Sequence, residues 1–202
     1  MQTQEIAMNK LTPSDLFPLE QYARMRNEFR QKVMAHKKDR QVQIGPNAAL
    51  YFEDRLTMQY QVQEMLRIER IFEPEGIAEE LEAYNPLIPD GSNWKATFMI
   101  EYPDIEERRV ALTRLKGIED RVWVHIAGHE RVFAVADEDL ERADDTKTAS
   151  VHFLRFELTS AMARAVREGA AVAIGIDHPA YRHAVDPIAS STRDSLAGDL
   201  NA

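Results

Sequence analysis

The residues with the clearest capacity for chemistry lie in one short segment, DHPAYRH at 177–183. Its carboxylate and two imidazoles, Asp177, His178 and His183, are groups that can bind a divalent metal or act as general acids and bases. The segment follows the most apolar stretch of the chain, AAVAIGI, so we expect an exposed loop held by a buried strand. The spacing matches no established ligand motif, and the alternative is a proline-containing turn whose polar side chains face water.

A carboxylate at an unexpected position is the second candidate. The chain from Phe52 to Phe72 lacks Gly and Pro, which predicts a continuous helix. Glu69 falls in the middle of the apolar stripe of that helix, which comprises Met58, Val62, Met65, Leu66 and Phe72. Burying a carboxylate is costly unless it is paired, hydrogen-bonded, protonated or bound to a metal. We therefore expect Glu69 to be either an internal ion pair with an arginine or a functional carboxylate.

Other histidines give weaker signals. His125 and His129 have the i, i+4 spacing of a helical metal pair, but apolar alternation around His125 and a turn at Gly128 predict a hairpin with His129 at its tip. The two imidazoles could still converge on a ligand across that turn. His152 shares a strand face with large apolar residues, which favours a core imidazole bonded to the backbone. The candidate metal set is therefore Asp177, His178 and His183, with His129 or Glu69.

A basic run from Arg24 to Arg40 stands out in a chain whose net charge is −9. It contains seven basic residues against two acids, a local charge of +5. Because the run lies on a predicted helix, it is either a solvated face or a docking surface for an acidic protein partner. The docking residues are taken to be Arg24, Arg26, Arg30, Lys37 and Lys38.

The elements that must position these residues divide the chain into two halves. Residues 11–95 are predicted to be mainly helical, with a small hairpin around a Gly-Pro-Asn turn. Residues 96–186 are predicted to be rich in strands, whereas residues 187–202 form a tail with one weak helix and residues 1–10 a flexible lead. We expect a single α+β domain over 11–202, in which the helical half packs on a mostly antiparallel sheet carrying one or two helices.

The composition limits the classes of function. A chain of 202 residues with 44% hydrophobic residues can bury a core without disulfides or structural metal. The absence of cysteine excludes disulfides, cysteine-ligated zinc, thiol catalysis and an iron–sulfur cluster on this chain. The acidic net charge disfavours generic binding of nucleic acid. The first fifteen residues lack an apolar signal region and no stretch could span a bilayer, so we expect a cytoplasmic protein.

Several catalytic motifs are missing from the sequence. There is no Glu-x-x-His pair, so a ferritin-like di-iron site on this chain is not expected. There is also no glycine-rich dinucleotide or phosphate loop, no His-Glu-x-x-His and no Gly-x-Ser-x-Gly. The sequence therefore indicates no reaction and no specific cofactor beyond a divalent metal.

With these stretches in view, the chain resembles an uncharacterised bacterial family, the domain-of-unknown-function family 3501, from about Leu11 to Asp199. The resemblance is carried by long runs that include AHKKDRQVQIGP, FEDRLTMQYQVQEMLRIERIF, AYNPLIPDGSNWKATFMIEYPD and GIDHPAYRH. It implies a context rather than an activity, since members tend to be encoded beside a rubrerythrin-like protein and an iron–sulfur oxidoreductase. It supplies no catalytic motif that could be transferred to residues of this chain.

Two hypotheses from different classes follow. The first is an accessory binding protein of a bacterial redox or oxidative-stress system, which associates with the rubrerythrin-like or iron–sulfur oxidoreductase protein, with the basic run as one docking surface. The second is a metal-dependent enzyme or metal-binding subunit that uses the His/Asp/Glu set. A structural or small-molecule-sensing module is a third. The second hypothesis requires His129, His178, His183 and Glu69 to point into one cavity.

Overall fold

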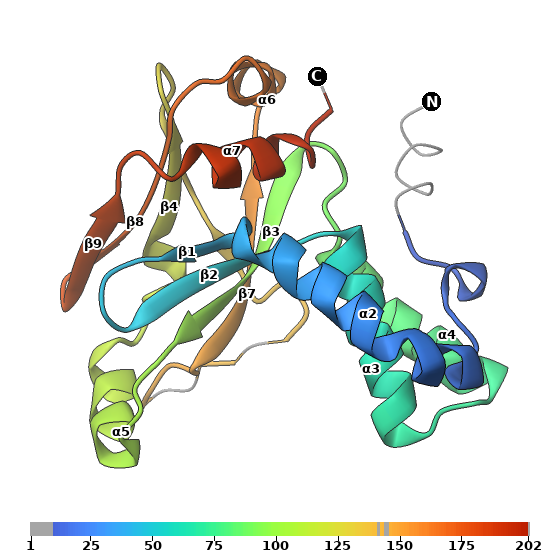
Figure 1. Cartoon of the computed structure of the whole chain (residues 1–202). Helices are drawn as coiled ribbons and strands as arrows, with labels where there is room; N and C mark the ends of the chain where they lie inside the picture. Colours follow the sequence, from blue (N-terminus) through green and yellow to red (C-terminus); the bar gives the residue numbers. More distant parts are fainter. Residues whose placement is uncertain (1–9, 141, 144–145, 202) are drawn as a thin grey trace.

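A computed structural model describes residues 10–140, 142–143 and 146–201 of the chain. Apart from Lys10, the flexible lead predicted for residues 1–10 lies outside the described residues. The described chain forms two antiparallel sheets, with one group of helices beside them and further helices at their ends (Figure 1). The predicted α+β class is confirmed, although the strands form two sheets rather than one.

The first sheet has five strands in the order β1-β2-β3-β7-β6. Every neighbouring pair is antiparallel, and the predicted hairpin around the Gly-Pro-Asn turn supplies β1 and β2. The strands span Gln41–Gln43 (β1), Ala48–Glu53 (β2), Asn93–Ile100 (β3), Val135–Ala136 (β6) and Val151–Glu157 (β7). In β3 and β7 buried and half-buried residues alternate, so these strands turn one face to the core.

The second sheet has four strands in the order β5-β4-β8-β9, again all antiparallel. The strands span Val122–Ile126 (β4), Arg131–Phe133 (β5), Val172–His178 (β8) and Tyr181–Val185 (β9). The most apolar strand, β8, lies between β4 and β9, as a nearly fully buried strand must. The segment RVFAVA, which follows the predicted turn at His129, is shared between the sheets: β5 pairs with β4, and β6 pairs with β7.

One apolar cluster joins the two sheets. Its largest members are fully buried: Leu50, Phe52, Trp94, Phe98, Ile126, Phe156, Ile174 and Ile176. Removing each such side chain from water stabilises the fold by roughly 1.5–3 kcal/mol. Three helices cover the ends of this cluster: α5 (Ile105–Arg114), α6 (Ser160–Arg167) and α7 (Ser190–Ala197).

The remaining helices form a bundle beside the first sheet (Figure 1). They are α2 (Leu19–Lys38), α3 (Arg55–Glu69) and α4 (Pro74–Tyr84), with short 3-10 turns at Pro13–Asp15 and Asn85–Leu87. A third 3-10 turn, Glu119–Arg121, lies outside the bundle and precedes β4. The bundle has its own buried residues, Tyr22, Phe29 and Val33 from α2 and Met58, Val62 and Leu66 from α3. No helix in the described part of the chain is long and apolar enough to cross a membrane.

The C-terminal tail is anchored more firmly than the predicted weak helix suggests. Leu196 and Leu200 are buried in the shared cluster. The indole N–H of Trp94 donates to the Leu196 carbonyl at 2.9 Å, and the Asn201 N–H donates to the Gly91 carbonyl at 2.8 Å. The tail therefore belongs to the folded core, because it satisfies buried polar groups as well as covering apolar ones.

The close approach of β8 to Trp123 gives a test of the packing. A Cβ atom at Gly175 would lie 2.3 Å from the Trp123 ring, so Gly175→Ala must displace a buried indole. We expect this variant to lower the free energy of unfolding by about 1–3 kcal/mol, measured by urea denaturation. Gly198→Ala is the control. Gly198 has an ordinary φ of −65°, and a Cβ atom there would lie 3.2 Å from the Ser195 carbonyl oxygen rather than against a buried ring. Equal stability of the two variants would contradict the packing at β8.

Candidate functional site

The segment 177–183 is a hairpin, not the exposed loop expected from the sequence. Asp177 and His178 end β8, and Tyr181 to His183 begin β9 after a two-residue turn. Register pairs Asp177 with Arg182 and His178 with Tyr181. Because strand pairing continues through the segment, its neighbouring side chains point to opposite faces of the sheet.

The polar groups of this hairpin already have partners. Asp177 forms an ion pair with Arg182 at 2.9 Å. The Nδ1 atom of His178 accepts the Ala180 N–H at 3.1 Å, which leaves Nε2 to donate to the Lys116 carbonyl at 3.1 Å. Both nitrogens of a buried imidazole are thus used to fix the turn. His183 is exposed, and its ring packs on that of Tyr181 with centroids 4.6 Å apart.

Glu69 is exposed, so its predicted burial is wrong. The helix ends at Glu69, and Arg70 adopts a left-handed conformation with φ of 55° that turns the chain away. The buried stripe stops at Leu66, and the side chain of Phe72 is 65% exposed. Periodicity alone could not show that the last turn of the helix extends past the elements that cover it.

The predicted metal-binding set does not converge in the structure. His129 lies at the turn between β4 and β5, as predicted, whereas His178 and His183 lie on β8 and β9 and Glu69 ends α3. Within the residues that the structure describes, no group of three or more His, Asp or Glu side chains is arranged to hold a metal ion. The geometry therefore gives no support to a metal centre built from these residues.

His152 forms a buried polar network whose order resembles that of a catalytic triad. Its Nδ1 lies 2.6 Å from an Asp137 carboxylate oxygen, and its Nε2 lies 2.8 Å from the Thr148 hydroxyl. Thr148 is 1% exposed, and its hydroxyl donates to Glu119 at 2.9 Å. A substrate cannot reach this hydroxyl, so the network stabilises the core. The Ala149 carbonyl, 3.1 Å from Nε2, supplies the backbone partner that was expected for this imidazole.

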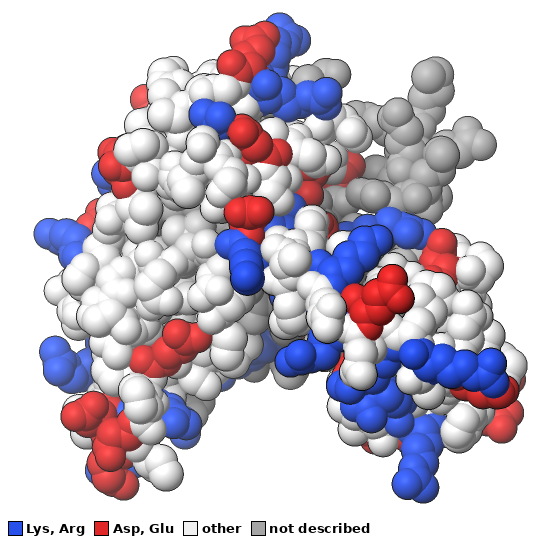
Figure 2. Space-filling model, in the orientation of Figure 1, with Lys and Arg blue, Asp and Glu red and all other residues white. Residues whose placement is uncertain are grey.

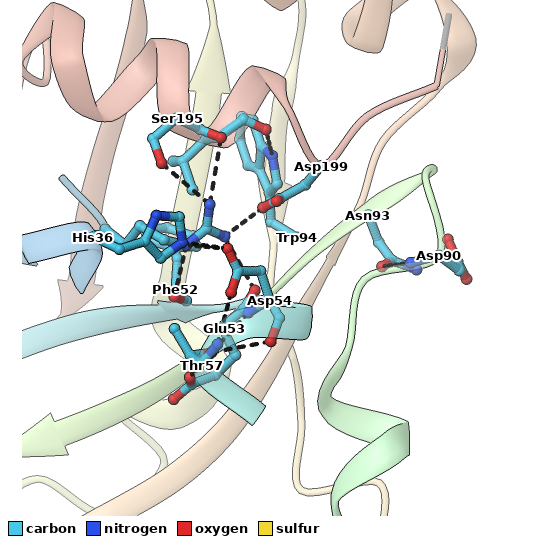
Figure 3. A network of polar contacts seen from close by, with 12 residues as sticks. His36, Phe52, Glu53, Asp54, Thr57, Asp90, Asn93, Trp94, Ser195 and Asp199 are labelled. Carbon is cyan, nitrogen blue, oxygen red and sulfur yellow. Dashed lines mark hydrogen bonds and ion pairs between the residues drawn. The ribbon is translucent and has the colours of Figure 1, made fainter. Parts of the chain in front are cut away.

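Arg40 forms the second buried network, shown in Figure 3. Although it belongs to the basic run, Arg40 is only 2% exposed. Its guanidinium donates to the Phe52 and Glu53 carbonyls at 3.1 Å each and to Ser195 at 3.3 Å. It also pairs with Asp199 at 2.5 Å. One side chain thus joins the end of α2, the end of β2 and the C-terminal helix α7.

Asp54 connects this network to the helical bundle. One carboxylate oxygen accepts the Thr57 N–H at 2.9 Å and caps the first turn of α3. The other lies 2.5 Å from His36 Nε2 and 3.5 Å from the guanidinium of Arg40. Burial raises the pKa of Asp54, but Arg40, the Thr57 N–H and His36 outweigh that effect and hold the pKa below its usual value.

A polar recess of about 550 Å³ opens beside the Arg40 network. Its walls include the carboxylates of Asp54, Asp90 and Asp199. Asp90 lies apart from the other two (Figure 3) and binds the hydroxyl and N–H of Ser92. Asp54 and Asp199 share one guanidinium, so the recess borders a satisfied structural network rather than a group of free ligands.

Little in the sequence signals these buried ionisable residues. Arg40 belongs to the basic run from Arg24 to Arg40, and Asp199 belongs to the tail for which one weak helix is predicted. Asp54 could have been identified as a helix cap, because it precedes the helix and Thr57 follows three residues later. The contacts that bury Arg40 span 12 to 159 positions along the chain, a separation that local patterns do not report.

Replacement of Arg40 tests its structural role. Arg40→Met keeps the volume of the side chain but leaves Asp199 and two carbonyls without their buried donor. We expect a loss of about 3–5 kcal/mol in the free energy of unfolding, measured in urea. Arg114→Met is the control, because Arg114 is exposed and has no ion pair with any residue the structure describes. An Arg40→Met protein as stable as this control would refute the role.

Asp199 gives a prediction for pH. Burial raises its pKa to about 6, against the opposing pull of Arg40, from a usual value of 3.8. The folded protein therefore binds this proton more tightly than the unfolded chain, and the resulting stability is complete below pH 3.8 and lost as the pH rises through 6. Between these two pH values, the free energy of unfolding of the wild-type protein should fall by up to roughly 3 kcal/mol relative to that of Asp199→Asn, measured by urea denaturation. A pH-independent difference would contradict the raised pKa.

The predicted docking residues on α2 differ in their availability. Arg26 is engaged within the fold, because its Nε and Nη2 each donate to one carboxylate oxygen of Glu64 in α3 at 2.8 Å, and this pairing lowers the pKa of Glu64 to about 2. Arg24 pairs with the exposed Glu20. Arg30, Lys37 and Lys38 have no ion pair with any described residue, and Figure 2 shows Lys and Arg side chains gathered over α2.

Comparisons with known proteins give a family and a solved relative. A model of DUF3501, described as a protein of unknown function, matches residues 10–200. A crystal structure of a novel protein of unknown function from Burkholderia pseudomallei K96243 is 51% identical, with a TM-score of 0.90. The match covers 95% of this chain and 100% of that chain. Among curated proteins, no match was found.

Proposed function

The chain belongs to the DUF3501 family of proteins of unknown function, and on this premise we propose that it is an accessory binding protein of a bacterial redox or oxidative-stress system. In this role it docks an acidic protein partner in the cytoplasm and carries out no reaction itself. The single observation that carries the proposal is the set of cations on α2 that are left without ion pairs in the described structure.

The charge distribution favours docking over a merely solvated face. The chain carries a net charge of −9, yet Arg30, Lys37 and Lys38 project from one helix without a carboxylate partner among the described residues. A basic patch orients an acidic partner during encounter, and the acidic remainder of the protein surface repels that partner. The ion pairs of Arg26 within α2 and of Arg40 just after it hold in place the helix that carries these cations.

The polar networks support binding rather than catalysis. The imidazoles of His152 and His178 are occupied by carboxylate, hydroxyl and backbone partners. These hydrogen bonds account for the burial of both imidazoles, so no substrate is needed to explain it. The proposed partner class, a rubrerythrin-like protein or an iron–sulfur oxidoreductase, follows from the genomic context that the family resemblance implies.

Co-purification with the two neighbouring redox proteins tests the proposal. We expect association at low salt that weakens as salt screens the exposed charges. Reversal of two cations, Arg30→Glu with Lys38→Glu, should weaken binding by at least about tenfold. The matched control is Arg114→Glu, an exposed arginine on α5, which should leave binding unchanged. Absence of association at low salt, or an equal effect of the control, would refute docking through α2.

A further inference from the structure

The outer face of the five-stranded sheet carries a second hollow, which we call the open-face cleft. It is lined by residues of β2, β3 and β7 and by residues of helices α2, α3 and α4, and its volume is about 520 Å³. Tyr51, Thr97 and Phe153 lie in register across the three strands and form its floor. Their neighbours along the strands point into the core, so these residues face the opposite side. A volume of this size suits a small molecule.

Glu53 places a buried carboxylate in the wall of the open-face cleft. The residue is only 6% exposed. Its two oxygens accept the hydroxyls of Thr97 at 2.7 Å and Thr57 at 2.6 Å, which leaves further acceptor capacity on each oxygen. No cation forms an ion pair with Glu53 among the described residues. Lys95, the cross-strand neighbour of Glu53, donates to the Pro86 carbonyl and forms no ion pair with Glu53 among the described residues. Since buried charges are normally paired, Glu53 can accept a positive group in the cleft.

A second carboxylate adds to the negative charge of the cleft. Glu101 lines the same hollow and accepts the Tyr51 hydroxyl at 3.0 Å. It too has no ion pair in the described part of the chain. Lys37 is the one cation among the lining residues, and its ammonium lies beyond ion-pair distance of both carboxylates. Two unpaired carboxylates against one ammonium favour a cationic ligand.

The remaining walls suit an apolar body attached to such a cation. They are built from aromatic, thioether and aliphatic side chains: Tyr51, Tyr84, Phe153, Met58, Met99 and Leu87. Aromatic faces attract organic cations, and methionine adapts its shape to rings. An adjoining cavity of about 290 Å³ shares Leu87 and Phe153 with the cleft, and its other lining residues include two cations, Lys95 and Arg155, and two carboxylates, Glu138 and Asp139.

We propose that the open-face cleft binds a small organic cation, an amine or amidine on an apolar body. The cationic group pairs with Glu53 and the body lies between Phe153 and the two methionines. An anion would meet two carboxylates. A bare metal ion would find thioether and aromatic walls in place of a full shell of oxygen ligands. A neutral ligand would leave Glu53 buried without a counter-charge.

Benzamidine, benzamide and benzoate test this proposal, because they share one ring and differ in charge. Calorimetric titration of the full chain should show saturable binding of benzamidine with a Kd below about 1 mM. Benzamide should bind at least about tenfold more weakly, because it cannot neutralise Glu53, and benzoate should not bind measurably. No saturable binding of benzamidine, or equal binding of benzamide, overturns the proposal.

Two variants locate the binding. Glu53→Gln keeps the shape and hydrogen-bonding capacity of the side chain but removes its charge, and it should weaken benzamidine at least about tenfold without changing benzamide. Leu87→Trp should fill the cleft and abolish binding while leaving Glu53 and its hydroxyl partners in place. Glu82→Gln, an exposed carboxylate on α4, is the matched control and should bind as the wild type does.

Benzamidine binding that survives Leu87→Trp, or that a folded Glu53→Gln protein keeps undiminished, would place the ligand elsewhere and overturn the assignment. Leu87→Trp keeps the test valid even if Glu53→Gln does not fold. The experiment uses neither a protein partner nor the exposed cations Arg30 and Lys38. Its outcome is therefore independent of docking through α2, and either proposal can fail alone.

Discussion

The burial of one guanidinium is the constraint on which the rest of this structure depends. The guanidinium of Arg40 is buried away from water, so its N–H donors need acceptors within the fold. These acceptors lie at the end of β2, in α7 and at Asp199. A protein without disulfides thereby ties its C-terminal tail to its first hairpin. The apolar cluster supplies most of the stabilising free energy, whereas Arg40 determines which segments meet.

The same network shapes both surfaces to which functions are assigned. Arg40 follows α2, and Asp54, its neighbour in the network, caps α3, so the two helices are fixed at one point relative to the sheet. The orientation of α2 presents its unpaired cations to solvent. The position of α3 brings Met58 over the sheet and closes the open-face cleft, in whose wall Glu53 accepts the hydroxyl of Thr57.

These surfaces have opposite charge and different character. The α2 surface carries cations without ion pairs among the described residues and is suited to an acidic partner. The open-face cleft is concave, partly apolar and negative, and it is suited to a small cation. Neither surface uses the imidazoles that the sequence offers for catalysis, because those of His152 and His178 are committed to internal hydrogen bonds. Both proposals therefore concern binding, one at the α2 surface and one at the open-face cleft, with Lys37 at the boundary between them.

Local patterns in the sequence predicted most of the helices, the hairpin that carries His129, the core position of His152 and the interior position of β8, because periodicity and turn residues act over a few positions. They did not predict β9, the division of RVFAVA between two sheets or the end of α3 at Glu69. The tertiary structure alone decided which ionisable side chains are buried and which are exposed. Glu69 lies on an apolar stripe yet faces water, since the covering elements stop before it. Arg40 belongs to a basic run yet is buried, and Glu53, which no sequence pattern singles out, is buried as well, because segments far along the chain pack over both residues. Burial of an ionisable group depends on what packs over it, and distant segments decide that.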